Sequence, residues 1–207
     1  MTKTLAEVEK MAASGALLAS VFTLLDRTPL AGMTTMQVND LVEDYITREL
    51  QARPASKGQY DYPYVLNASK NEVVCHGMPS NDEIIENGEI INFDITLEKD
   101  GYIADSSKTY MVGDVAPFAS RLVRVTYEAL WKGIAAVRPG ATLGDIGHAI
   151  ERHAKRHDYS IVREYCGHGI GRVFHEEPQV LHYDADDGGV VLQKGMTFTI
   201  EPMVNAG

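Results

Sequence analysis

The chain has 207 residues, of which 44% are hydrophobic and 23% charged, and its formal net charge is -10 at pH 7. This composition predicts a packed core, and the acidic balance excludes the basic stripe that nucleic-acid binding requires. Two cysteines are too few for a disulfide framework, and with neither an apolar signal core nor a long uncharged apolar run we expect a cytoplasmic protein with no membrane span.

Apolar residues recur at helical spacing in four segments of the chain. The first predicted helix runs from Leu5 to Leu25, and the second begins at a capping threonine, Thr34 or Thr35, and ends at about Leu50. Pro117 begins a third helix that reaches about residue 137. A fourth helix follows Thr142 and ends at about residue 157.

Between the helix pairs the pattern changes to that of extended chain. Residues 90–97 and 102–105 alternate between apolar and polar side chains, and Lys99-Asp100-Gly101 lies between them. An Asp-Gly pair in that setting predicts a β-hairpin. Residues 59–77 and those from Ile161 onward are expected to form strands and loops, with a strand at 196–204.

The two halves of the chain resemble each other. Gly32-Met33-Thr34 is matched 108 residues later by Gly140-Ala141-Thr142. Gly88 precedes Asp94 by six residues, as Gly195 precedes Glu201 at an offset of 107. This self-similarity predicts one domain over residues 1–207, built from duplicated helix-helix-strand halves at about 5–113 and 117–207, with Asp94 and Glu201 facing each other across a pseudo-two-fold axis.

The second half ends before it can repeat the hairpin of the first. Strand 196–204 is therefore expected to lack the mate that strand 90–97 has, so that the second half is truncated. Either the chain is a fragment or another surface covers this apolar edge, because proteins normally cover such strands. A homo-oligomer formed through 196–204 is one such arrangement.

Four side chains have the chemistry of metal ligands. Asp94 and Asp105 lie on the two arms of the hairpin, His168 lies in a Gly-His-Gly-Ile-Gly run, and Glu201 lies on the last strand. Carboxylates among apolar neighbours are rarely buried unless they are paired or bound to a cation. Three carboxylates and one imidazole would suit a divalent transition metal.

Two further histidines could exchange a proton with a substrate held at such a metal. His76 ends an apolar run, and His175 lies in Phe-His-Glu-Glu-Pro. The other four histidines, in helical or polar contexts, are interpreted as surface residues: His148, His153, His157 and His182. The two cysteines are interpreted as small neighbours of functional histidines and not as nucleophiles.

These motifs, taken together, resemble those of the bacterial type I methionine aminopeptidases, which have the α+β pita-bread fold. They occur in the family's order and span essentially the whole chain. The runs that carry the resemblance are Asn71-Glu72-Val73-Val74-Cys75-His76-Gly77-Met78-Pro79, Asn92-Phe93-Asp94-Ile95-Thr96, Asp105-Ser106-Ser107-Lys108-Thr109, Gly167-His168-Gly169-Ile170-Gly171, Phe174-His175-Glu176-Glu177-Pro178 and Thr199-Ile200-Glu201-Pro202-Met203.

The resemblance implies removal of the N-terminal methionine from nascent proteins by a metal-activated hydroxide. Two divalent ions, of manganese, iron, cobalt or zinc, would bind Asp94, Asp105, His168 and Glu201, with Asp105 bridging them. Glu201 would also relay the water's proton.

The resemblance also assigns residues to the substrate. His175 would steady the scissile carbonyl, and His76 would contact the peptide nitrogen beyond the scissile bond. Tyr62 and Phe174 match positions of the methionine pocket.

The chain departs from the family at three places. The family's second bridging glutamate lies on a strand beyond residue 207. Asn67 stands where a pocket cysteine is usual, and Gln59 stands at a common tyrosine position. Two functions remain open at this point: an active aminopeptidase, and a catalytically impaired relative that binds a metal or an N-terminus.

Overall fold

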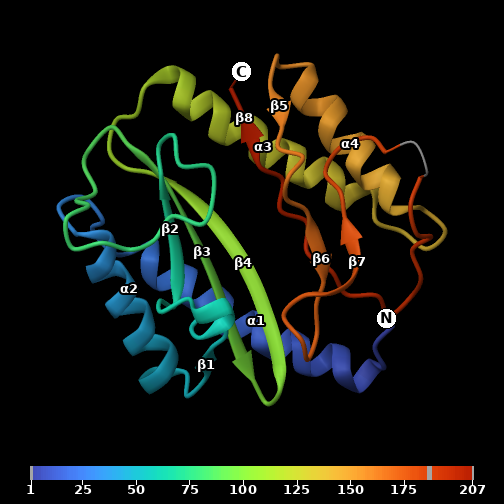
Figure 1. Ribbon diagram of the computed structural model, residues 1–207, viewed down its shortest axis with the longest axis horizontal. Helices are drawn as coiled ribbons and strands as arrows, with labels where there is room; N and C mark the ends of the chain where they lie inside the picture. The colour runs from blue at the N-terminus through green and yellow to red at the C-terminus, as the bar shows by residue number, and fades with distance from the viewer. Residues whose placement is uncertain (1, 186–187, 207) are drawn as a thin grey trace. The chain divides into compact units, whose positions relative to one another are not determined.

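The computed structural model describes residues 2–185 and 188–206 (Figure 1). The chain divides into two compact units. The N-terminal unit comprises residues 9–116, and the C-terminal unit comprises residues 117–206 together with residues 2–8. Each unit has its own hydrophobic core.

Helix α1 spans Leu5–Leu25, as its apolar spacing predicts. Leu18, Val21 and Leu25 are buried in the core of the N-terminal unit. By length and composition alone α1 could cross a bilayer, with a mean hydropathy of 1.4, contrary to the expectation that no segment could. A core helix of a globular domain passes the same test, and Leu18, Val21 and Leu25 give α1 a buried side, although only 22% of the tested window is buried.

Helix α2 spans Thr35–Asp44 and begins with a capping box. The Thr34 hydroxyl accepts the N–H of Gln37 at 3.1 Å, and the Gln37 side chain accepts the N–H of Thr34 at 2.9 Å. The predicted helix to Leu50 changes its winding before it ends, because Tyr45–Glu49 forms a π-helix.

The sheet of the N-terminal unit is antiparallel, with β3 at its centre. Its strands are β1 (Arg53–Pro54), β2 (Leu66–Lys70), β3 (Ile90–Lys99) and β4 (Tyr102–Met111). Strands β3 and β4 form the predicted hairpin, and β4 is longer than expected. Asp100 and Gly101 both have positive φ, at 52° and 78°, which is the signature of a two-residue type I′ turn.

The two faces of this sheet differ in chemistry. Ile91, Phe93, Ile95 and Leu97 of β3 are fully buried in the core with α1 and α2. Because side chains alternate along a strand, Asn92, Asp94 and Thr96 lie on the opposite face. The hairpin therefore presents its acidic residues on the face that the core does not cover.

Two helices form the core of the C-terminal unit. Helix α3 spans Pro117–Ala136 and α4 spans Leu143–Lys155, close to the predicted bounds. Thr142 caps α4 through a second capping box, with Asp145 as its partner. Val125 and Ala129 of α3 pack with buried side chains of α4, among them Ile150.

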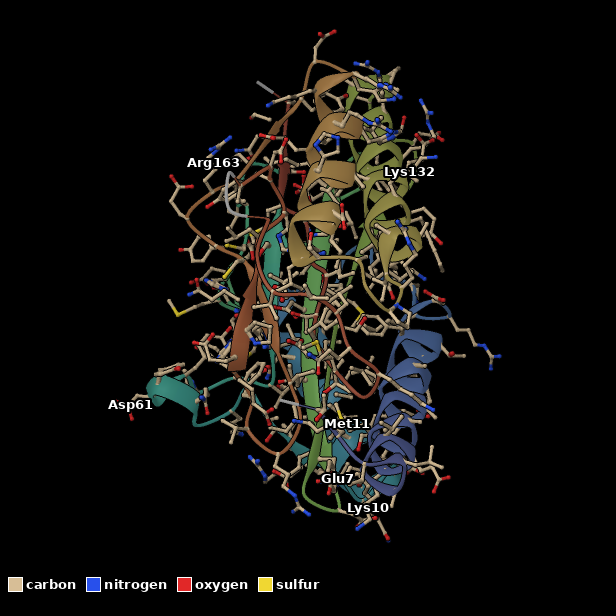
Figure 2. All side chains as sticks on the ribbon, turned by 90° about the vertical axis from the view of Figure 1, so that its right-hand side faces the viewer. Glu7, Lys10, Met11, Asp61, Lys132 and Arg163 are labelled. Carbon is tan, nitrogen blue, oxygen red and sulfur yellow. The ribbon has the colours of Figure 1, made fainter. Side chains whose placement is uncertain are left out.

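Glu151 is a buried acid on α4, with 5% of its surface exposed. Its carboxylate accepts the Asp184 N–H at 3.1 Å and Arg163 Nη2 at 3.0 Å, and Lys155 Nζ lies at 3.1 Å (Arg163 is labelled in Figure 2). Desolvation raises the pKa of Glu151, but the hydrogen bonds from Asp184, Lys155 and Arg163 outweigh it and hold the pKa below its ordinary value. Glu151 is therefore ionised at neutral pH.

Four short strands complete the C-terminal unit: β5 (Ser160–Ile161), β6 (Gly167–Gly169), β7 (Glu176–Val180) and β8 (Val204–Asn205). The expectation that 196–204 lacks a strand partner is wrong for one of its edges. Thr199 donates its N–H to His168 at 2.8 Å, and β8 pairs with β5. The partner of this segment, Gly167–Gly169, is distant in sequence and rich in glycine. It therefore lacks the alternation of apolar and polar residues by which a strand is recognised in a sequence.

The duplicated halves share a backbone hydrogen-bond pattern. Gly32 donates its N–H to Ile85 O at 2.8 Å, and Gly140 donates to Leu192 O at 3.1 Å. The φ angles of the two glycines are 88° and 87°. The matched sequence motifs thus fold into matched local structures, one in each unit.

Candidate metal centre

In the N-terminal unit, Asp94 and Asp105 lie on one face of the hairpin. Asp94 is opposite Ser107, and Asp105 is opposite Thr96, two residues from Asp94. Directly opposed residues share a face, so the two aspartates are diagonal neighbours, about 7–8 Å apart between backbone positions. Both side chains are half-buried. Carboxylates at this spacing and in this setting can share cations.

Asn67 lies beside Asp94. Strand β2 places the two residues opposite each other, and Asn67 Nδ2 donates to Asp94 Oδ2 at 3.2 Å. A hydrogen bond to one carboxylate oxygen fixes the orientation of the Asp94 side chain. The residue that departs from the family's pocket pattern is therefore also a neighbour of a predicted ligand.

Tyr62 follows a 3-10 turn at Gln59–Asp61, in which Gln59 is half-buried. Its hydroxyl donates to Leu66 O at 2.9 Å. Burial, together with the neighbouring Tyr64 and the charge of Asp94, raises the pKa of Tyr62 to about 12. Tyr62 is therefore a neutral donor at every physiological pH.

His76 lies on an exposed loop with a positive φ of 56°. The loop is held against β2: Gly77 donates its N–H to Ser69 Oγ at 3.1 Å, and Ala68 donates to Gly77 O at 2.8 Å. A Cβ at Gly77 would lie 2.1 Å from Ala68 O, so only glycine permits this approach. These contacts hold Gly77, the residue after His76, against Ala68, the residue after Asn67 on β2.

In the C-terminal unit, His168 is buried on β6, with 9% of its surface exposed. Its Nδ1 lies 2.9 Å from Gly169 O, and a carbonyl can only accept, so Nδ1 carries the hydrogen. Nε2 therefore presents a lone pair, 3.6 Å from Glu201 Oε1. A lone pair and a carboxylate oxygen that face each other in a partly buried setting are suited to a cation between them.

Glu201 is held from two sides. Thr199 Oγ1 donates to Glu201 Oε1, and the Glu201 N–H donates to His182 Nε2 at 3.1 Å. His182 is fully buried, so its interpretation as a surface residue is wrong. Burial lowers the pKa of His182 to about 4, and its Nδ1 has no hydrogen-bond partner among the described residues.

Phe174 and His175 form a stacked pair beside His168. Their ring centroids lie 4.4 Å apart at 8°, and the His175 ring meets the His168 ring edge-on at 4.4 Å. Phe174 is half-buried and His175 is exposed. The stack on Phe174 sets the plane of the His175 ring beside His168.

Cys166 is the thiol nearest to these groups in sequence. Burial and the charge of Glu201 raise the pKa of the Cys166 thiol. A protonated thiol is a poor nucleophile, which agrees with the interpretation of Cys166 as a residue that is not a nucleophile.

Each unit holds side chains whose donor chemistry fits a divalent metal. In the N-terminal unit they are the carboxylates of Asp94 and Asp105. In the C-terminal unit they are His168, in the tautomer that a ligand requires, and Glu201. Carboxylate and imidazole donors of this kind bind manganese, iron, cobalt or zinc.

Residues 9–207 match the model of Metallopeptidase family M24, and the chain belongs to that family. Divalent metal use follows from this membership. Within the family the chain is similar to methionine aminopeptidases along nearly its whole length. It is 51% identical to the methionine aminopeptidase of Salmonella typhimurium over 205 residues, which are 99% of this chain and 78% of that one.

Solved structures agree with this similarity. The methionine aminopeptidase of Rickettsia prowazekii has a TM-score of 0.96 and 46% identity, with 100% of this chain and 83% of that one covered. The enzyme of Thermotoga maritima has a TM-score of 0.95 and 38% identity, with the same coverage. The predicted pita-bread fold and the predicted resemblance are both confirmed.

Proposed function

We propose that this chain removes methionine from the N-terminus of polypeptides in a reaction that depends on divalent metal ions. The observation that carries the proposal is similarity to methionine aminopeptidases over 99% of the chain. The polar face of the hairpin and the lone pair of His168 supply donors of the required chemistry, and nothing in residues 2–185 and 188–206 favours a non-catalytic binding module.

Asp94, Asp105, His168 and Glu201 are the residues that would hold two divalent ions of manganese, iron, cobalt or zinc. When bound, such ions lower the pKa of water and polarise a carbonyl group. Asn67 orients Asp94 through its 3.2 Å hydrogen bond. Thr199 and the backbone contact to His182 hold Glu201, which accepts the proton of the attacking water.

The remaining proposed site residues act on the peptide. His175 donates to the scissile carbonyl oxygen, with its ring plane set by the stack on Phe174. His76 contacts the peptide nitrogen beyond the scissile bond. Tyr62, Asn67 and Phe174 line the pocket for the methionine side chain, where the neutral hydroxyl of Tyr62 adds no charge.

The proposed substrates are the N-termini of nascent polypeptides, and the proposed compartment is the cytoplasm. Cys75 and Cys166 form no disulfide, which is consistent with a reducing compartment. A homo-oligomer through 196–204 stays a prediction, since one edge of that segment already pairs within its own unit.

The test is release of methionine from a Met-Ala-Ser peptide. The metal-free chain is titrated with manganese, iron or cobalt, and Asp105→Asn is compared with Asn92→Ala, which lies on the same face and donates to Thr109 Oγ1 at 3.0 Å. We expect Asp105→Asn to lose more than about 100-fold in turnover, because it removes a proposed ligand. Mutation of a residue that only hydrogen-bonds to a metal ligand already lowers metal affinity or activity by about 10–100-fold. Equal turnover in the two variants would contradict the proposal.

A further inference from the structure

A second group of metal-type side chains lies on the helix pair of the C-terminal unit, on elements that carry none of the proposed catalytic residues. Glu128 is on α3, His153 is on α4, and His157 follows the end of α4. Each offers one ligand atom, and these three atoms lie within 4.8 Å of one another. Figures 1 and 2 show the two helices side by side, with Lys132 labelled on α3 in Figure 2.

The two histidines converge where α4 ends. His157 lies in the turn after the helix, where its N–H donates to Ala154 O at 3.0 Å, and the rings of His153 and His157 have centroids 4.9 Å apart. His153 Nε2 lies 3.1 Å from Glu128 Oε2. The carboxylate and the first imidazole are thus already in contact across the helix pair.

Two arginines of α3 hold this group in place. Arg124 Nη1 donates to Glu128 Oε1 at 3.2 Å, so Oε2 is the carboxylate oxygen that faces the histidines. Arg121 Nη2 donates to His157 O at 3.1 Å and fixes the backbone beyond the helix end. Desolvation raises the pKa of Glu128, but the hydrogen bonds from His153 and Arg124 outweigh it and keep the pKa below its ordinary value.

We propose that Glu128, His153 and His157 bind one divalent transition-metal ion of the zinc class, which ties α3 to α4. Zinc ligands at about 2.0–2.2 Å in a tetrahedron are separated from one another by about 3.3–3.6 Å. All three side chains are only half-buried and their ligand atoms already lie within 4.8 Å of one another, so small side-chain rotations bring them to this separation. Water fills the fourth position.

The ligand chemistry separates this site from the proposed catalytic centre. Two imidazoles and one carboxylate favour zinc, copper or nickel, whereas the oxygen-rich set of the catalytic centre also accepts manganese. Because the ion binds the folded arrangement of two helices, it stabilises the folded state by mass action. Its role is therefore structural, and peptidase activity with manganese does not depend on it.

The test measures zinc binding in the Asp105→Asn background, where the proposed catalytic centre is impaired. Zinc stoichiometry is determined by equilibrium dialysis, and the melting temperature is followed as zinc is added. His157→Gln and Glu128→Gln are each introduced into this background. The matched control is His148→Ala, on the same helix, whose Nδ1 lies 2.9 Å from Asp184 Oδ2 and outside the group.

We expect the Asp105→Asn chain and the His148→Ala control to bind this zinc ion. Each should gain about 5 °C or more in melting temperature at a free zinc concentration 100 times the dissociation constant. His157→Gln and Glu128→Gln should bind the ion at least about 10-fold more weakly, because they remove ligands themselves. Their metal-free melting temperatures report that they fold.

Zinc stoichiometry and thermal shift that are unchanged in both variants would overturn the proposal. So would a thermal shift lost equally in His148→Ala, since that would place the ion elsewhere on α4. A cobalt-substituted chain adds a direct readout, because a tetrahedral site gives visible absorption bands that the two variants should lose.

Discussion

Replacing Asn67 with alanine removes the amide that donates to Asp94 Oδ2 at 3.2 Å. Hydrogen bonds to charged groups contribute about 1.5–3 kcal/mol to stability. Because the distance from Asn67 Nδ2 to Asp94 Oδ2 is at the long end of the normal range, we take the lower of these energies. About 1.5 kcal/mol corresponds to roughly a tenfold change in an equilibrium constant. If Asp94 is a metal ligand, the dissociation constant of the activating metal should rise about tenfold in Asn67→Ala.

The assay is a manganese titration of the metal-free chain, followed by methionine release and, separately, by calorimetry. Asn92→Ala is the matched control, because Asn92 lies on the same sheet face and donates to Thr109, not to Asp94. Asn67 is also a proposed pocket residue, so KM for the peptide is measured at saturating metal. A changed KM with an unchanged metal dissociation constant would refute the reasoning that Asn67 acts through Asp94.

Three other changes test the scaffold. Glu151→Ala orphans the Asp184 N–H and should lower the free energy of unfolding by about 2–3 kcal/mol in urea titrations, and Glu151→Gln by less. Because folding lowers the pKa of Glu151, its stabilisation of the fold is fully present above the unfolded-state pKa of about 4.3 and is lost as the pH falls through the folded-state pKa. A difference in unfolding free energy between the protein and Glu151→Ala that persists at about pH 2 would contradict this reasoning. Gly77→Ala would place Cβ 2.1 Å from Ala68 O, so kcat/KM should fall at least about tenfold by displacement of the loop, and unchanged kinetics would count against that loop as part of the site. His182→Leu removes the acceptor of the Glu201 N–H, which is part-buried, and should lower the stability of the metal-free chain by about 1–3 kcal/mol in thermal unfolding, whereas unaltered stability would mean that the Glu201 N–H finds another acceptor.

Local signals in the sequence predict the framework of this molecule well. Helical apolar spacing defines α1 from Leu5 to Leu25, and the threonines before α2 and α4 are the observed caps. The Asp100-Gly101 pair forms the predicted turn. Each of these features depends on residues that are close together in the chain, which explains why sequence reasoning finds them.

Features that depend on long-range register escape the same reasoning. The contact between Asn67 and Asp94 follows from the pairing of β2 with β3, which no local pattern specifies. His182 is buried because of what packs over it, although its Leu-His-Tyr-Asp context suggests a surface residue. The partner of 196–204 is a glycine-rich segment without strand alternation, so its pairing could not be predicted.

The two-residue turn between β3 and β4 determines more than the direction of the chain. Side chains alternate strictly along β4, so a shift of its pairing by one residue would turn Asp105 toward the apolar core and Ala104 toward the polar face. A shift by two residues would keep Asp105 on its face but place it opposite Asp94 or Glu98 instead of Thr96, and so change its distance from Asp94. The number of residues in this turn therefore determines both the sheet face on which Asp105 lies and its distance from Asp94. A relative could replace Asp100 or Gly101 by other residues that tolerate positive φ more readily than it could lengthen or shorten the turn.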